Sequence, residues 1–317
     1  MRKIFSLILG LALIPFISNA AYPDKPITLI VPFPAGSATD TVARTLAEEM
    51  SSDLRQTIIV DNKPGAQGII GMNAAIKAAP DGYTLVVLGV TTGASNVSLF
   101  KKLSYDPIKD LTPLGMVAES PIVLVSAPGF KANNSGDLFK LGKENPGKLT
   151  YAYGSGSAQV AAAKLIDMGG IKAVGVPYKG SPQALIDVMS GQVDFMFIDL
   201  SLAIPQIEAG KLKALGVTTK TPFSIVPKIP TINQSGAPGY ELVVWFALAG
   251  PAGIPQPVVT RISQALDKAL QSPALQKRYF GLGLEVKQMS PSGFGNFLKS
   301  EIQNWGQLIR QAGIQAE

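Results

Sequence analysis

The segment from Ile27 to Met50 constrains the fold of this chain more than any other. An apolar, strand-like run over Ile27–Val31 is followed by the small polar loop Pro34–Asp40 and then by a helical pattern, in which apolar residues recur every four positions from Val42 to Met50. The first turn of such a helix has N–H groups without an intrahelical acceptor, at the positive end of the helix dipole. The junction is therefore either an ordinary turn between a strand and a helix or a seat for an anion such as a carboxylate or phosphate.

The N-terminus has the pattern of a secretory signal peptide over residues 1–20. Arg2 and Lys3 precede the apolar stretch Ile4–Ile17, and Ser18-x-Ala20 supplies the small residues of a cleavage site. The apolar stretch is shorter than a membrane span requires, and no Cys follows it that would take a lipid. We therefore expect an exported, soluble protein without a lipid anchor.

The chain contains no Cys and no His. The lack of Cys excludes disulfides, and without either residue type a structural zinc site is not expected. The lack of His removes the commonest general base and the Ser-His-Asp triad. The formal charge of +6 is scattered along the chain, and no basic stripe indicates a nucleic-acid partner. We expect no cofactor, no metal and no catalytic residues.

Strand-like and helix-like patterns alternate after the signal, which is typical of an α/β protein with a mostly parallel sheet. A first series reaches about Leu114, and a second series follows a strand candidate at Ile122–Ser126. Because the roughly 297 residues that remain without the 20 of the signal exceed one comfortable core, we expect two domains. The last third is helical, with an apolar stripe over Val258–Ala269 and another in a final helix that begins at Ser290-Pro291.

Four loops rich in Gly, Ser and Thr follow strands, and ligands of open α/β sheets bind at the carboxyl ends of the strands. Two loops fall in each series, so we expect a cleft between two lobes that grips a small anion from both sides. The loops are Pro34–Asp40, Thr91–Asn96, Gly154–Ser157 and Lys179–Pro182. Asp40 and Ser181 also suit a simpler role as helix N-caps.

The other motifs carry less information. Gly65–Gly71 has the spacing GxxGxxG and not the dinucleotide-binding GxGxxG, and Ser98-x-x-Lys101 fits the Ser-Lys acylating enzymes without their companion elements. Near one strand end, Asp194 suits a structural role, whereas Asp199 is better placed to face a cleft. An exported enzyme acting on small acids through Ser and Lys stays an alternative that lacks a good catalytic pair.

Taken together, eight segments closely resemble the tripartite tricarboxylate transporter substrate-binding proteins, the Bug family. They run in order, without large gaps, from about Tyr22 to Gly313. The segments are YPDKPITLIVPFPAGSATDTVAR, NKPGAQGIIG, APDGYTLVVL, LSYDPIKDL, VPYKGSPQALIDVMSGQVDFMF, AGKLKALGVTT, IPTINQSGAPGYE and WFALAGPAGIP.

The resemblance implies a periplasmic binding protein of the type II fold. In this fold two α/β lobes are joined by crossing strands, here expected near Ile122–Ser126 and Val244–Ala249, and the ligand cleft lies between the lobes. The expected lobe 1 comprises residues 21–123 and 247–317, and the expected lobe 2 comprises residues 124–246.

The resemblance also implies a function without catalysis. Such a protein captures a small organic acid in the periplasm and delivers it to the subunits of a tripartite tricarboxylate-type membrane permease. We expect it to act as a monomer. A sensor that presents its ligand-bound form to a signalling receptor stays open as an alternative, because both roles use the closed lobes as the signal.

In this family a ligand carboxylate is held mostly by main-chain groups, often with ordered water. Carried over, the Gly36–Thr39 loop cradles one carboxylate, Ser155–Ser157 faces it from the second lobe, and Thr92 and Asp199 help to set specificity. The predicted ligand-binding residues are Pro34, Ala35, Gly36, Ser37, Ala38, Thr39, Asp40, Thr92, Gly93, Ser155, Gly156, Ser157, Tyr178 and Asp199.

The chain departs from the family pattern at these loops. Members commonly have two or more glycines where this chain has Gly36-Ser37-Ala38. They often carry a His in the segments that match Thr92–Asn96 and Ala158–Ala161, and each segment is about one residue shorter here. We therefore expect a pocket of different shape and polarity, which leaves a less polar acid or an uncharged relative open as the ligand.

Overall fold

The computed structural model describes residues 22–317, so the predicted signal peptide, residues 1–20, lies outside the described residues. Strands and helices alternate as the sequence predicts, and the strands form one ten-stranded sheet. The strands are β1 Ile27–Val31, β2 Ile58–Asn62, β3 Thr84–Gly89, β4 Leu111–Ser126, β5 Leu149–Tyr153, β6 Ala173–Pro177, β7 Phe195–Asp199, β8 Lys213–Val217, β9 Val243–Pro251 and β10 Glu285–Met289.

Most connections between these strands contain a helix. The α-helices are α1 Ala38–Leu54, α2 Ile69–Ile76, α3 Asn96–Leu99, α4 Ser135–Glu144, α5 Gly156–Gly169, α6 Ser181–Met189, α7 Leu200–Glu208, α8 Gln256–Gln271, α9 Pro273–Gly281 and α10 Pro291–Gln311. A short 3₁₀ turn spans Ala66–Gly68, and one π-helical turn spans Thr91–Ser95. Among the helices of residues 22–317, none combines the length and apolar character that a membrane crossing needs.

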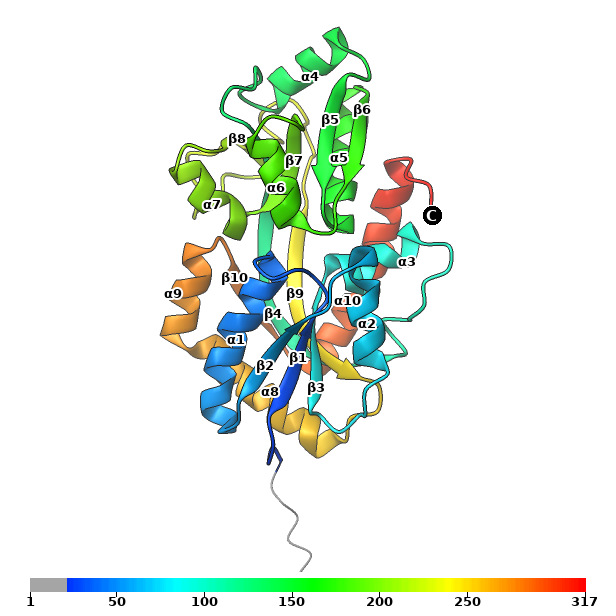
Figure 1. Ribbon diagram of the computed structural model, residues 1–317, viewed down its shortest axis with the longest axis vertical. Coiled ribbons are helices and arrows are strands. Elements are labelled where there is room, and N and C mark those ends of the chain that lie inside the picture. Colours follow the sequence, from blue (N-terminus) through cyan, green and yellow to red (C-terminus); the bar gives the residue numbers. More distant parts are fainter. Residues whose placement is uncertain (1–21) are drawn as a thin grey trace, which may run out of the picture.

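The sheet is divided between two lobes, as the resemblance implied (Figure 1). The first lobe has the strand order β2-β1-β3-β9-β4, with β10 also on β4, and the second has β4-β7-β5-β6, with β8 also on β4. Strands β1, β2 and β3 pair in parallel, as do β5, β6 and β7, whereas β4 and β9 run antiparallel to their neighbours. The prediction of an α/β fold with two lobes is confirmed.

Strand β4 carries the chain from one lobe into the other. It pairs with β9 as far as Pro121 and with β7 from Ile122 onward. Strand β9 pairs only within the first lobe, so the chain returns just before it, where Leu242 N–H donates to the Thr218 carbonyl (2.9 Å). The Thr218 hydroxyl donates to the Leu242 carbonyl (2.6 Å) and accepts from Ile122 N–H (3.0 Å). One buried threonine thus ties together the two segments that cross between the lobes.

The core follows the predicted helix faces closely. In α1 the apolar stripe from Val42 to Met50 is buried against the sheet and α8. In α8 the buried face starts at Val259, one residue after the predicted Val258, which is only half-buried. The final helix α10 buries Phe294, Leu298, Trp305 and Ile309, while Phe297 and Ile302 pack at its margin.

One predicted loop is helical. The segment Thr91–Asn96 forms the π-helical turn and leads directly into α3, and all six residues are buried. Its Gly, Ser and Thr content predicts a loop, but tertiary packing overrides these weak local preferences. Gly93 shows the reason, because an added Cβ would lie 2.6 Å from Trp245 Cη2. The small residues let this turn lie directly on the indole.

Candidate functional site

Helix α1 begins at the polar loop after β1. Ser37 is its N-cap, and the Ser37 hydroxyl accepts a hydrogen bond from Asp40 N–H (3.3 Å). The Asp40 carboxylate reaches back and accepts from Gly36 N–H (2.9 Å), so these two side chains bond to the backbone on either side of the helix start. The prediction that Asp40 is the N-cap is therefore wrong. Asp40 lies three residues after the cap, because Ser37 already has the extended backbone that a cap needs.

Asp40 is held by groups of the protein itself. Besides Gly36 N–H, Arg44 Nε (3.0 Å) and Asn62 Nδ2 (2.9 Å) donate to its carboxylate. Burial alone would raise the pKa of Asp40, but hydrogen bonds from Arg44, Gly36 and Asn62, with the Arg44 charge, hold it below its usual value. Asp40 therefore fixes the shape of the loop.

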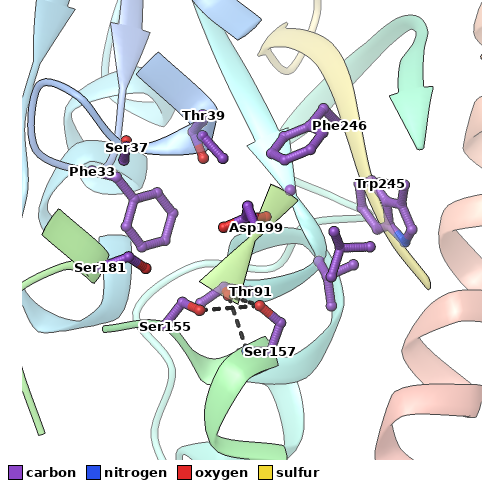
Figure 2. Close-up of a pocket in the computed structure, with 14 residues that line it drawn as sticks. Phe33, Ser37, Thr39, Thr91, Ser155, Ser157, Ser181, Asp199, Trp245 and Phe246 are labelled. Carbon is purple, nitrogen blue, oxygen red and sulfur yellow. Dashed lines mark hydrogen bonds between the residues drawn. The ribbon is translucent and has the colours of Figure 1, made fainter. Parts of the chain in front are cut away.

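Helix α5 begins opposite α1, in the second lobe. Ser155 is its N-cap and accepts from Ala158 N–H (3.3 Å). Ser157 N–H donates instead to the Thr91 hydroxyl of the first lobe (3.2 Å). The Ser155 and Ser157 hydroxyl oxygens lie 3.1 Å apart, and Figure 2 shows both beside Thr91. This helix start therefore meets the end of β3 directly.

The starts of helices α6 and α7 also lie in this region of the second lobe. The N-cap of α6 is Gly180, so the prediction of Ser181 as the cap is wrong; Ser181 is the first helical residue, followed by a proline that suits the first turn. Asp199 occupies the N-cap position of α7, but its side chain does not cap that helix. Because first-turn N–H groups lack intrahelical acceptors, the starts of α1, α5, α6 and α7 make this region positive.

These helix starts enclose a small cavity between the lobes (Figure 2). Its volume is about 40 Å³, room for only a few water molecules. Among its lining residues there is no Lys or Arg, and Asp199 is the only one with a formal charge. The lining residues are Phe33, Ser37, Ala38, Thr39, Gly89, Val90, Thr91, Ser155, Ser157, Ser181, Asp199, Val244, Trp245 and Phe246.

The lobes are closed on each other around this cavity. Thr91 bonds to Ser157 across it, and Gln67 Nε2 donates to Gln159 Oε1 (3.4 Å). At the rim, a Cβ added to Gly180 would lie 2.7 Å from the ring carbons of Pro34. The two lobes therefore touch on several sides of the site, and a ligand inside is reached by both.

The Asp199 carboxyl group faces this cavity from the end of β7. Burial raises its pKa to about 6, while a hydrogen bond from its own N–H opposes the shift. Its side chain is partly accessible from the cavity but is surrounded by protein on all sides. Asp199 is therefore mostly ionised at neutral pH, in a region where the helix starts are otherwise positive.

The structure brings some of the predicted site residues together at the cavity. Six line it, from both lobes, and they are Ser37, Ala38, Thr39, Ser155, Ser157 and Asp199. The hydroxyl of Thr39 has no hydrogen-bond partner within residues 22–317. Four hydroxyl-bearing residues and one carboxyl group of the predicted set thus line the cavity.

Other predicted residues lie outside the cavity lining. Ala35 and Gly36 are exposed to solvent, and Thr92 is buried beneath the site, where its hydroxyl contacts the Gly89 carbonyl (3.4 Å). Tyr178 donates to the Asp187 carboxylate (2.5 Å) within the second lobe. The remaining four have structural roles. Pro34 contacts Gly180 at the rim, and Asp40 holds the loop before α1. Gly93 packs on Trp245, and Gly156 packs against Leu99.

Sequence reasoning missed eight lining residues. Thr91 and Ser181 lie in loops that it selected, and Phe33 directly precedes one of them. The others come from the end of β3 and from β9, which lie side by side with Gly89 opposite Phe246. That antiparallel pairing joins segments far apart in the chain, so no local pattern reveals it. The missed residues are Phe33, Gly89, Val90, Thr91, Ser181, Val244, Trp245 and Phe246.

Two lobes that close on a small cavity lined by helix starts define a solute-binding protein. Residues 42–314 match the family described as "Tripartite tricarboxylate transporter family receptor". The chain therefore belongs to the tripartite tricarboxylate transporter receptor family.

Three relatives illustrate the likeness. BugT of Bordetella pertussis is 32% identical over 94% of this chain and 92% of its own length. A solved R. palustris protein with adipate is 30% identical, with a TM-score of 0.91 over 93% of this chain and 100% of that one. MatC of Rhodopseudomonas palustris, solved with bound malate, is 31% identical, with a TM-score of 0.87 over 91% of this chain and 100% of its own.

The family and its solved structures consist of solute-binding proteins and not of enzymes. The assignment of this chain to a binding class is confirmed on that basis. The Ser-x-x-Lys pair of the alternative enzyme also lies apart from the cavity, because Ser98 packs against α10, where a Cβ added to Gly306 would lie 2.9 Å from its hydroxyl.

Proposed function

We propose that this protein binds a small organic acid in the cavity between its lobes and delivers it to a tripartite tricarboxylate-type permease. The observation that carries the proposal is the meeting of four helix starts at one small cavity between the lobes, which has hydroxyl groups and no basic side chain. Unpaired N–H groups at helix starts bind a carboxylate without a formal cation. The first-turn N–H groups of Ala38 and Thr39 are the candidate donors in the first lobe.

Two relatives support the ligand class. The structures with adipate and with malate each hold a dicarboxylate, in proteins that share the fold over nearly their whole length. The permease and the periplasmic location belong to the proposal through family membership. The receptor is taken as a monomer, since one chain completes the cavity.

The lobe boundaries are part of the same proposal. Lobe 1 comprises residues 21–123 and 247–317, and lobe 2 comprises residues 124–246. The change of β4 pairing at Ile122 supports a boundary close to the first of these limits. The pairing of β9 from Val243 within the first lobe favours a second boundary a few residues earlier.

A thermal-melt screen of the mature protein tests the ligand class. The ligands are mono-, di- and tricarboxylates, amino acids and aromatic acids, each beside its amide. An acid at about 100 times its Kd adds roughly 2.7 kcal/mol to the free energy of unfolding, which raises the melting temperature by several degrees, and its amide does not. If the amides shift the melting temperature as much as the acids do, the cavity does not select a carboxylate.

A pair of matched variants tests the location. Thr39→Val removes a hydroxyl that lines the cavity, whereas Thr45→Val removes a buried hydroxyl that donates to the Thr41 carbonyl (3.0 Å) in the same helix. Because a hydrogen bond to a charged group contributes about 1.5–3 kcal/mol, Thr39→Val should weaken the acid identified in the screen at least tenfold. Equal affinities for the two variants would place the ligand elsewhere.

A further inference from the structure

Asp199 is an ionisable group that an anion-binding cavity does not need. It ends β7 and holds the N-cap position of α7, with φ −63° and ψ 144°, yet its side chain leaves the helix start uncapped. Its carboxyl group is directed into the cavity instead, and Figure 2 shows it in the middle of the labelled residues. A residue type that commonly caps helices therefore faces the cavity and leaves its helix uncapped.

The protein itself supplies no cation for this carboxylate. Within residues 22–317, no side chain donates a hydrogen bond to it and no Lys or Arg pairs with it. A carboxylate that is largely surrounded by protein and has no partner is costly, because it loses much of its water and gains no hydrogen bond or ion pair in return. Such a group is explained most simply if its partner is the ligand.

The charge of Asp199 restricts what that ligand is. A plain carboxylate seated on the helix starts would bring a second negative charge into a cavity of about 40 Å³, where like charges repel strongly. A ligand with a protonated amine close to its carboxylate avoids this repulsion, since the ammonium faces Asp199 while the carboxylate faces the N–H groups. Phe33 and Phe246 line the same cavity, and aromatic faces also attract an ammonium group.

We propose that Asp199 binds a protonated amine of the ligand, so that the receptor selects a compact amino acid over the corresponding acid without the amine. This inference rests on the proposed function, because it adds a second contact to a ligand whose carboxylate is held by the helix starts. The small closed cavity favours an amine on the first or second carbon from the carboxylate.

Calorimetric titration with matched pairs tests this specificity. The pairs are glycine with acetate, L-alanine with propionate, and β-alanine with propionate, at pH 7.5. The wild-type protein should bind the aminated member of at least one pair ten times more tightly or better. Asp199→Asn, which keeps the shape of the side chain, should reduce that ratio to about one, by weakening the amino acid and by leaving the plain acid unchanged or tighter.

Asp194→Asn is the matched control. Asp194 directly precedes β7, but its carboxylate accepts from the Thr150 N–H (2.7 Å) and hydroxyl (3.0 Å), outside the cavity. This variant should keep the wild-type ratio. A second readout is pH: the wild-type ratio should fall between pH 7.5 and pH 5, because Asp199 gains a proton and no other titratable side chain lines the cavity.

The outcomes separate the inference from the function beneath it. If the wild-type protein binds plain acids as tightly as their aminated partners, or if Asp199→Asn leaves the ratio unchanged, the inference is overturned and the proposed function stands. If no acid of any pair binds, the inference is overturned, and the thermal-melt screen over the wider set of acids decides the proposed function. A ratio that Asp199→Asn abolishes and Asp194→Asn retains would establish Asp199 as the residue that sets specificity.

Discussion

Asp40 and Asp199 occupy similar places in the two lobes and have opposite environments. Each lies at the start of a helix that follows a strand of the sheet: Asp40 is in the first turn of α1, which follows β1, and Asp199 is the last residue of β7, directly before α7. Asp40 accepts hydrogen bonds from Gly36, Arg44 and Asn62, whereas Asp199 accepts none from another residue among those described. The pKa of Asp40 is accordingly lowered, and burial raises that of Asp199 to about 6.

The difference shows how one local design serves two purposes. In the first lobe the protein satisfies the carboxylate completely and thereby fixes the loop before α1. In the second lobe it buries a carboxylate and leaves it facing the cavity, at a cost in folding free energy that a ligand can offset. A buried acidic residue without a partner therefore points to binding, while a fully bonded one points to stability.

The largest expected effect is on the satisfied carboxylate. Asp40→Asn replaces an acceptor oxygen by an NH₂ group that faces donors, so it should lower the free energy of unfolding by about 2–4 kcal/mol at pH 7. The loss should shrink in acid, because a carboxylate with a lowered pKa stabilises the fold above its unfolded-state pKa and loses this effect as pH falls. Urea denaturation at pH 7 and at pH 3, below the usual pKa of an aspartate, measures both. A variant as stable as the wild type would remove Asp40 from its structural role.

The same substitution in the second lobe should have the opposite sign. The pKa of Asp199 rises from 3.8 to about 6 on folding, so the folded state holds more protons between these values and its stability falls as pH rises through them. Without ligand, Asp199→Asn should therefore raise the free energy of unfolding above pH 6, on the order of 1–3 kcal/mol. The gain should vanish near pH 4. Denaturation curves between pH 4 and pH 7.5 measure the free energy of unfolding of both proteins. A variant less stable than the wild type at pH 7.5 would show that the Asp199 carboxylate has a stabilising partner in the protein.

Gly36 lies in the loop before α1, and its N–H donates a hydrogen bond to the Asp40 carboxylate. Its φ of 78° is in the left-handed region, and an added Cβ would meet nothing within 4 Å. Gly36→Ala should therefore cost about 1 kcal/mol through backbone conformation alone, without a change in ligand affinity. Gly191→Ala, at φ 75° and equally open, is the control in the second lobe. A large loss of affinity in Gly36→Ala alone would show that the ligand touches this exposed part of the loop.

The smallest effect is expected at the contact between the lobes. Thr91→Val removes the acceptor for Ser157 N–H across the cavity, so it should weaken ligand binding by about 0.5–1 kcal/mol, or two- to fivefold. The melting temperature without ligand should change little. Calorimetry measures the affinity, and a loss of a hundredfold would mean that Thr91 bonds to the ligand itself.

The sequence predicts best those features that depend on residues close together in the chain. The loop from Pro34 to Asp40 predicts the start of α1, and the alternation of strands and helices predicts the α/β fold. The role of Asp40 was not predictable, because Asn62 approaches it from the neighbouring strand β2, and strand order is not written in local pattern. The same holds for Phe246, which reaches the cavity through the pairing of β9 with β3.

The most direct measurement of the contrast is a carboxyl ¹³C NMR titration of the mature protein, with and without a bound amino acid, using Asp40→Asn and Asp199→Asn to assign the two signals. Asp199 should titrate near pH 6 in the free protein and at a lower pH when an ammonium group is bound. Asp40 should titrate below its usual range in both states. An Asp199 signal that titrates near pH 4, or one that a bound amino acid does not move, would contradict a role for Asp199 as the partner of the ligand's ammonium group.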